Sequence, residues 1–520
     1  MSFGKRGSRV AGVLAVAATF LVAGCAGVAN QASNQAQAAV DPNATVRVGI
    51  SVPPSQNDPL QVRSELAALP YLSAQFDTLI GIDAAGASKP LLAESWQVSP
   101  DGTSMTLKLR QGAVFHDGSP IDQTAVVANL QRAMQSQNPL VQVKFGKAAA
   151  VAPEGTDSVR ITLKAPDPLL VSNLSSPVMG MVSPAGFATV GTAPIGSGPY
   201  RFVSQTQDSA TFARFDGYWD PAGKAPAAQL VIKSIPDNAA RVNALRAGQL
   251  DFINAQPDQA KDLKSLESDP TNKVQFVKTQ ATAAVFLNIG RGPLADPRVR
   301  QALNYAVDRQ ALNQALVGGI CPPTPQPFPT GSGNVPDLDT AYPHDPAKVK
   351  QLLTEAGVPN LTLRGLFSNG ALAASMAPAI QGQFQAAGIG FDMSPVQPGE
   401  ARATFRRGEA DFLVLQINAE IDPALIIRNN FVGGDSPGGI SAELKASADK
   451  VLAMSESDPA RDAALQDFSR AAVQTPTHVL LCAVPSGFAY KSSVVGTDTM
   501  PWLSVAQNTD FRTLGKTTAA

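Results

Sequence analysis

The sequence has no excess of charge of either sign. Its 41 lysines and arginines balance 42 aspartates and glutamates, so the formal net charge of the 520 residues is -1. A protein that binds nucleic acid or an anionic surface through its overall field needs a clear excess of basic residues. We therefore expect no nucleic acid among the partners of this chain.

Histidine is scarce as well, with three residues in the chain. His116, His344 and His478 are more than one hundred residues apart from one another, and neither C-x-x-C nor H-E-x-x-H spacing occurs. A metal site built on a local motif is therefore excluded, and we expect no metal ion and no other cofactor.

One of these histidines stands beside a carboxylate, because His116 directly precedes Asp117. The pair falls between an expected strand at 104–110 and an expected helix at 124–134, and Asp117-Gly118 is a typical turn dipeptide. We interpret His116 and Asp117 as turn residues that support the fold and not as a catalytic pair.

Long apolar runs are absent after the first 25 residues, where nothing approaches the roughly 18 residues that a spanning helix needs. The early apolar run, 10–22, follows Lys5, Arg6 and Arg9 and is typical of a secretory signal. Its end, Leu-Val-Ala-Gly-Cys, resembles the bacterial lipobox, in which the cysteine is acylated. We expect a signal peptide at 1–24 and a lipidated, flexible tether at 25–44 that begins with Cys25; a cleaved signal with a chance cysteine is the alternative.

Cysteine is rare, with three residues in all. If Cys25 carries lipid, Cys321 and Cys482 remain, and export permits a disulfide between them. Their spacing leaves open whether they pair or are buried separately.

The rest of the chain has the periodicity of a mixed α/β protein. Alternating apolar residues predict strands at 45–52, 104–110 and 158–164. An apolar stripe that follows Asp296-Pro297 predicts one helix reaching Gly318-Gly319, and Asp345-Pro346 predicts the start of another that stops at Gly357.

Five segments, taken in order, resemble the signature segments of the family 5 solute-binding proteins, the extracytoplasmic receptors of ABC importers for dipeptides, oligopeptides, nickel chelates and related solutes. They are LLAESWQVSPDGTSMTLKLRQGAVFHDGSPIDQTAVVANLQRAM, PIGSGPYRF, FDGYWD, IPDNAARVNALRAGQLDF and PLADPRVRQALNYAVDRQAL. The resemblance extends from about residue 46 to about residue 514. Five ordered segments are far more specific than one motif.

The resemblance implies an α/β fold of the periplasmic-binding-protein type II kind, with two large lobes joined by hinge strands and an extra inserted lobe. Lobe I would comprise 45–72, 192–283 and 485–512, lobe II 73–191, and lobe III 284–484. A solute would be enclosed between lobes I and III by hinge closure.

In this family the ligand is contacted by three segments, which correspond here to 57–70, 363–372 and 417–423. With Gln416, which directly precedes the third segment, they give the ligand-binding candidates Arg63, Ser64, Glu65, Phe367, Ser368, Asn369, Gln416, Asn418, Ala419 and Glu420.

Dipeptide-binding relatives carry an aspartate three residues before an Asp-Pro pair and a tryptophan three residues earlier. Counting back from Asp422 gives Ala419 and Gln416, so neither residue is present. Those relatives also place an arginine for the ligand carboxylate in the second segment, and the stretch LFSNGALAAS at 366–375 has none. A buried ammonium without its carboxylate costs several kcal/mol, so we expect no free dipeptide as ligand. Glu420, Arg63 or Glu65 could each restore one charge from a nearby position.

We therefore expect a monomeric, lipid-anchored extracytoplasmic receptor that passes a peptide or peptide-like solute to ABC permease subunits. A nickel chelate, an opine or a sugar-like compound is the alternative solute.

The competing enzyme hypothesis rests on GDSPG at 434–438, which fits the G-x-S-x-G elbow of serine hydrolases with Ser436 as nucleophile and His478 as base. The elbow requires a helix after the serine, and Pro437-Gly438 opposes one. We expect a surface loop and no enzyme. A purely structural envelope lipoprotein is the third class, and it would not change shape with a solute.

Overall fold

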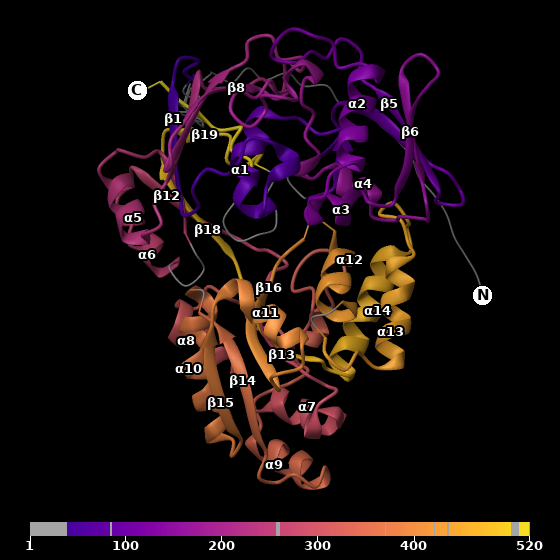
Figure 1. Ribbon diagram of the computed structural model, residues 1–520. Coiled ribbons are helices and arrows are strands. Elements are labelled where there is room, and N and C mark those ends of the chain that lie inside the picture. Colours follow the sequence, from indigo (N-terminus) through magenta and orange to yellow (C-terminus); the bar gives the residue numbers. More distant parts are fainter. Residues whose placement is uncertain are drawn as a thin grey trace, which may run out of the picture. The chain divides into compact units, whose positions relative to one another are not determined.

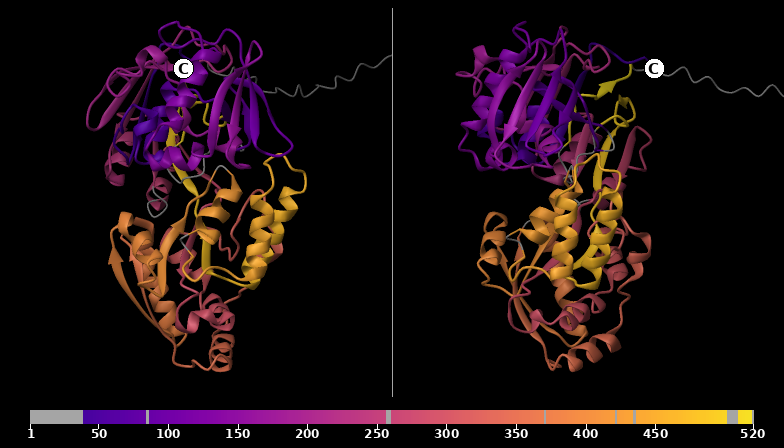
Figure 2. Two further views of the ribbon diagram at one scale, coloured as in Figure 1. Left: turned by 45° about the vertical axis from the view of Figure 1, so that its right-hand side comes forward. Right: turned by 90° about the vertical axis from the view of Figure 1, so that its right-hand side faces the viewer.

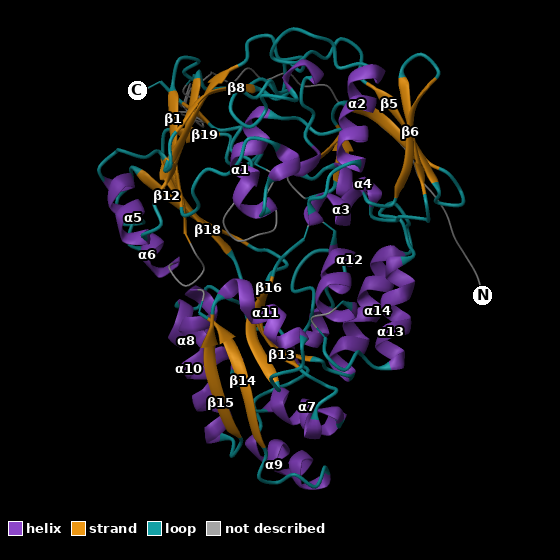
Figure 3. Ribbon diagram, in the orientation of Figure 1, coloured by secondary structure: helices purple, strands orange, loops and turns teal. Residues whose placement is uncertain are grey.

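The computed structural model describes residues 39–83, 86–255, 260–369, 371–420, 422–433, 436–500 and 509–518. Residues 39–520 form one compact unit of mixed α/β structure (Figures 1 and 3). The expected signal peptide, Cys25 and most of the expected tether lie outside the described residues. In the part that is described, no helix is both long enough and apolar enough to cross a membrane.

The largest sheet combines strands from three separate parts of the chain. Its order is β12 (Asn272–Val277), β18 (Ser486–Lys491), β11 (Phe252–Ala255), β1 (Thr45–Ile50), β10 (Gln229–Ser234), β9 (Ser209–Arg214) and β8 (Tyr200–Gln205). Helices α5 (Asn238–Arg246) and α6 (Ala260–Lys264) supply apolar residues to a core on one face of this sheet. We call this part the seven-stranded unit.

A second part is inserted between β1 and β8. Its sheet has the order β4 (Ala93–Val98), β5 (Ser104–Leu109), β7 (Ser158–Leu163) and β6 (Ala148–Glu154), with the ribbon β2 (Ile80–Ile82) and β3 (Ser88–Pro90) beside it. Alternate residues of β5 and β7 face a core that also contains α2 (Gln123–Met134), as the period-two pattern requires. Helices α3 (Pro139–Phe145) and α4 (Leu170–Leu174) complete this four-stranded unit.

Helix α1 (Glu65–Gln75) joins these two units. Its Ala68 and Leu72 belong to the core of the four-stranded unit, whereas Tyr71 and Ala74 belong to the core of the seven-stranded unit. Since one helix is shared by both cores, the two units are held together as one half of residues 39–520.

The third part, the five-stranded unit, has the sheet order β15 (Gly390–Val396), β14 (Thr362–Ser368), β16 (Phe412–Ile417), β13 (Thr282–Leu287) and β17 (His478–Ala483). Strand β13 is buried along its whole length, because its alternate residues enter two different cores, one on each face. One core contains α7 (Pro297–Tyr305), α8 (Arg309–Val317), α9 (Pro346–Glu355) and α10 (Ala371–Ala386). The other contains α11 (Pro398–Arg406), α12 (Pro423–Ile426), α13 (Ala442–Leu452) and α14 (Arg461–Gln474).

The chain passes between the two halves twice, and the two crossings lie side by side. One runs from β12 to β13 and the other from β17 to β18 (Figure 1). They are tied by hydrogen bonds from Thr279 Oγ1 to the Val484 carbonyl at 2.6 Å and from the Val484 N–H to the Ala281 carbonyl at 2.8 Å. Two adjacent strands are a connection about which the halves can rotate.

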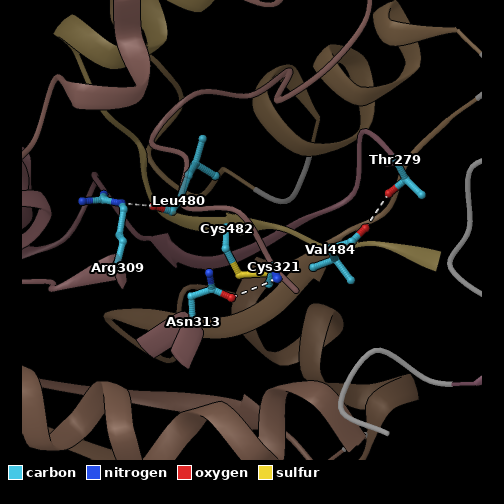
Figure 4. The surroundings of a disulfide bond; sticks show 7 residues. All are labelled: Thr279, Arg309, Asn313, Cys321, Leu480, Cys482 and Val484. Carbon is cyan, nitrogen blue, oxygen red and sulfur yellow. Dashed lines mark hydrogen bonds between the residues drawn. A yellow bond between two sulfur atoms is a disulfide. The ribbon is translucent and has the colours of Figure 1, made fainter. Parts of the chain in front are cut away.

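A disulfide joins Cys321 and Cys482 close to these crossings (Figure 4). Cys482 belongs to β17, two residues before Val484, and Cys321 lies in the turn after α8, where its N–H donates to Asn313 Oδ1 at 2.9 Å. The sequence left pairing and separate burial open; in the structure the bond fastens this turn to the strand that continues into the second crossing.

The predicted strands at 45–52, 104–110 and 158–164 are confirmed as β1, β5 and β7. The start of α9 is confirmed too, because Asp345 Oδ1 accepts the Lys348 N–H at 2.9 Å. The single helix expected after Pro297 is wrong: the chain forms α7 and α8, and Asp308 between them accepts the Ala311 N–H at 2.9 Å and caps the second helix.

Candidate functional site

Two of the three candidate segments leave the same edge of the five-stranded sheet. Strands β14 and β16 are parallel neighbours, with Phe367 opposite Val414, so their carboxyl ends lie together. Phe367 and Ser368 close β14, and Asn369 follows exposed, its N–H donating to the Val396 carbonyl at 2.9 Å. The segment that contains Asn418, Ala419 and Glu420 begins where β16 ends.

Glu420 is positioned by an irregular stretch of backbone. The strand stops at Ile417, so the alternation of faces expected for an extended segment does not apply to Glu420. Its carboxylate accepts a hydrogen bond from Asn429 Nδ2 at 3.3 Å. Asn429 lies in a π-helix, Ile427–Val432, which continues α12. Such wider turns are rare and are often found at functional sites.

Glu65 approaches from the other half, at the start of α1. Ser64 caps this helix by accepting the Ala67 N–H at 3.4 Å. The Glu65 carboxylate forms an ion pair with Lys144 Nζ of α3 at 2.9 Å and accepts a hydrogen bond from the buried Ser176 Oγ at 2.5 Å. These contacts fix the direction of the Glu65 carboxylate.

Glu65 and Glu420 interact electrostatically across the two halves. Burial, and after it the negative charge of Glu65, raise the pKa of Glu420 from 4.5 to about 7, although Lys144, Asn429 and Arg428 act in the opposite direction. Arg402 of α11 is a further cation that interacts with Glu420, and burial lowers its own pKa to about 10. Two carboxylates that repel each other favour the binding of a positively charged group near both.

The remaining candidates have less direct roles. Arg63 is exposed, and Ala419 is 1% exposed, so its side chain is part of the core. Gln416 Nε2 donates to Asn418 Oδ1 at 3.4 Å, and the Gln416 carbonyl accepts a hydrogen bond from Arg402 Nη2 at 3.2 Å. These contacts shape the end of β16 beside Glu420.

Sequence reasoning missed the hydrogen-bond and ion-pair partners of the two carboxylates: Lys144, Ser176 and Asn429. Each lies outside the three candidate segments, and each reaches Glu65 or Glu420 through tertiary structure. No spacing in the sequence signals them.

Cavities are found elsewhere in the described residues. One of about 150 Å³ lies beside α1 and Arg512, one of about 830 Å³ lies near Asn57 and Phe202, and a groove of about 790 Å³ runs between Trp96 and Ser457. Of these three, none is lined by Glu65 or Glu420. The candidate site is therefore defined by its side-chain contacts.

His116 and Asp117 form a structural corner. The His116 ring contacts the Gly198 carbonyl through Nε2 at 2.9 Å and accepts the Gly196 N–H through Nδ1 at 3.2 Å; burial lowers its pKa to about 4. Asp117 accepts hydrogen bonds from Ser119 and Ser183. Both side chains are used to join the turn to the segment at 183–198.

Ser436 and His478 are not arranged as nucleophile and base. Ser436 Oγ donates to the Asn430 carbonyl at 3.0 Å, and His478 Nδ1 is 2.9 Å from Thr477 Oγ1. The His478 ring lies between Phe286 and Phe431, and burial lowers its pKa to about 3. A turn and not a helix follows Ser436, so the elbow geometry is missing.

Known structures share this fold. The chain aligns with the PBP AgaA from A. tumefaciens R10, solved with agropinic acid, at a TM-score of 0.71 and 26% identity, over 87% of this chain and 94% of that one. It aligns with HbpA2 from Haemophilus parasuis at a TM-score of 0.78 and 20% identity, over 91% of this chain and 100% of that one. The expected α/β periplasmic-binding-protein fold is confirmed.

The sequence comparisons define the class more narrowly. Residues 87–438, more than half of the chain, match the family of bacterial extracellular solute-binding proteins, family 5 (middle). The chain belongs to this family. It is 33% identical over 341 residues to the glutathione-binding protein GsiB of Pectobacterium atrosepticum, and this match spans 63% of the chain and 65% of that relative. Since the family consists of binding proteins, the expectation that the chain is not an enzyme is confirmed.

Proposed function

We propose that this protein is a lipid-anchored extracytoplasmic receptor that captures a peptide-like solute carrying a positively charged amine and delivers it to an ABC import permease. The observation that carries the proposal is the electrostatic interaction between Glu65 and Glu420, one residue from each half. A cation between them replaces repulsion by two attractions, so solute binding and closure favour each other. The lobe boundaries given above from the resemblance belong to this proposal.

The charges of the site support a solute larger than a free dipeptide. The two carboxylates can hold an amine, but the family positions 419 and 416 carry Ala419 and Gln416, and no arginine follows β14 to hold a nearby carboxylate. Peptide-like recognition is also supported by the relative that binds glutathione. The alternative is a non-peptide solute, which the structural similarity to the agropinic acid complex favours.

Isothermal titration with glutathione, tripeptides and tetrapeptides tests the proposed ligand class. We expect binding of at least one free-amine compound, a loss of affinity of about tenfold or more on acetylating its amine, and a similar loss in Glu420→Gln. Glu443→Gln, an exposed change on α13, is the matched control and should bind as the wild type does. Equal affinity for free and acetylated compounds would exclude the amine subsite.

The lipid anchor at Cys25 is a separate part of the proposal, motivated by the basic start, the apolar run and the lipobox-like end of 1–25. Metabolic labelling with a fatty acid in a bacterial host should label the wild type, and Cys25→Ala should abolish the label. Equal labelling of both chains would show that Cys25 is not the acylated residue.

A further inference from the structure

The carboxylate of Glu456 bridges the seam between the two halves, at a place separate from the candidate site. Glu456 lies in the connection between α13 and α14 of the five-stranded unit. Its Oε1 accepts the Ser88 N–H at 3.2 Å, and its Oε2 accepts hydrogen bonds from Ser88 Oγ at 2.8 Å and Ser172 Oγ at 3.4 Å. Ser88 begins β3 and Ser172 belongs to α4, so one side chain contacts two elements of the four-stranded unit. The left view of Figure 2 shows the connection between the yellow helices α13 and α14 reaching up to the indigo and purple strands of that unit.

These contacts connect to the segment that carries Glu420. Ser172 Oγ also lies 3.4 Å from Asp422 Oδ2, two residues after Glu420. Asp422 caps α12 and is held by Arg461 Nη2 at 2.6 and 2.7 Å, and both residues of this ion pair are buried. Leu169, next to α4, enters the core formed by α12 and α14. The four-stranded unit therefore contacts the five-stranded unit beside the Asp422–Arg461 ion pair, which holds the segment that carries Glu420.

The chain connects the two halves through the two adjacent crossings, and rotation about these crossings would separate Ser88 from Glu456. Within the described residues, the hydrogen bonds that Glu456 accepts all come from the opposite half. The groove of about 790 Å³, lined by Gln97 on one side and Ser457 on the other, runs beside Glu456, so water can replace the serine donors.

We propose that Glu456, Ser88 and Ser172 form a latch that keeps the two halves closed in the absence of solute, with Glu456 as its positioning residue. The inserted four-stranded unit thereby takes part in closure. The latch sets the population of the closed form, and that population scales the apparent affinity for any solute. The proposal does not depend on the identity of the solute or on the amine subsite.

Small-angle X-ray scattering of the full-length, solute-free chain tests the latch. Glu456→Ala should give a larger radius of gyration than the wild type, because removing the acceptor lowers the ratio of closed to open molecules by about tenfold. Glu456→Gln keeps an acceptor for Ser88 and gains a donor, so it should restore most of the wild-type value. Glu443→Ala, on the same helical hairpin, should scatter as the wild type does. Thermal unfolding verifies that each variant is folded, and Ser88→Ala, which removes one donor, replaces Glu456→Ala if that variant does not fold.

Cross-linking provides an independent readout. Cysteines introduced by Gln97→Cys and Ser457→Cys would face each other across the groove, and a bifunctional maleimide can join them. In the solute-free chain, the rate of this cross-linking should be about tenfold lower with Glu456→Ala than without it. The single Gln97→Cys chain controls for reaction at other cysteines. Unchanged scattering together with unchanged cross-linking in Glu456→Ala would overturn the latch, and so would equal expansion in Glu443→Ala.

Discussion

At the scale of single residues, Glu420 shows why the site could be predicted only in part. The sequence and the family resemblance identified Glu420 and Glu65 as residues that could each restore a charge. They could not show that both restore it at one place, because the residues are separated by 355 positions and meet through folding. Lys144 and Asn429 escaped notice for the same reason. The sequence gives the type of each residue, whereas the charges around it depend on which residues the fold brings near it.

The raised pKa of Glu420 predicts a pH dependence of stability. Folding raises this pKa from 4.5 to about 7, so between these values the folded chain keeps a proton that the unfolded chain has lost. The free energy of unfolding therefore falls as the pH rises through this interval. The Glu420→Gln side chain cannot ionise, so its free energy of unfolding relative to the wild type should increase by about 1 to 2 kcal/mol between about pH 5 and about pH 8. This value is smaller than the free energy that corresponds to the full pKa shift, because the Glu420 side chain is partly exposed and solvent screens its charge.

Urea denaturation of the solute-free wild type, Glu420→Gln and the control Glu443→Gln at both pH values measures this difference. A gap between Glu420→Gln and the wild type that stays constant with pH would contradict the raised pKa.

At the scale of elements, local sequence rules predicted where helices and strands begin and end, but they did not predict whether a long apolar stripe forms one helix or two. The cap at Asp345 and the period-two strands follow from contacts within a few residues, and they were found. The apolar stripe after Pro297 predicts one helix because Val307 keeps the helical spacing. In the structure the Asp308 carboxylate accepts a hydrogen bond from the Ala311 N–H, and a second helix begins there. The π-helix after α12, in which Asn430 and Phe431 are buried, had no signal in the sequence.

The disulfide is the element-scale feature that can be removed cleanly. It closes a loop of 161 residues and holds the turn after α8 against β17. Its loss releases chain entropy in the unfolded state, so Cys321→Ala with Cys482→Ala should lower the free energy of unfolding by about 2 to 5 kcal/mol. Thermal unfolding with and without dithiothreitol measures the effect.

The double variant serves as its own control, because dithiothreitol should destabilise the wild type and leave the variant unchanged. If the wild type and the variant unfolded at the same temperature under oxidising conditions, the bond would have no stabilising role.

At the scale of the whole molecule, the five ordered segments implied the fold class, and the similar structures confirm it. Periodicity alone did not reveal that β1, β8 and β18 share one sheet, because strand order depends on contacts between distant parts of the chain. The two crossings, the electrostatic interaction of Glu65 with Glu420 and the proposed latch are the features on which the proposed closure of the two halves rests. The seam at Glu456 could not be located without the three-dimensional structure, because Ser88, Ser172 and Glu456 are far apart in the sequence.

Native mass spectrometry of the freshly purified full-length chain tests the central claim, that this protein is a receptor for an amine-bearing, peptide-like solute, most directly. The account predicts a population whose mass exceeds that of the chain by one small solute, either as purified or after incubation with glutathione and a mixture of tripeptides and tetrapeptides. Glu420→Gln should retain much less of it, because one of the two carboxylates has lost its charge. The account would be contradicted if the wild type showed only the unliganded mass under both conditions. It would also be contradicted if Glu420→Gln carried as much solute as the wild type.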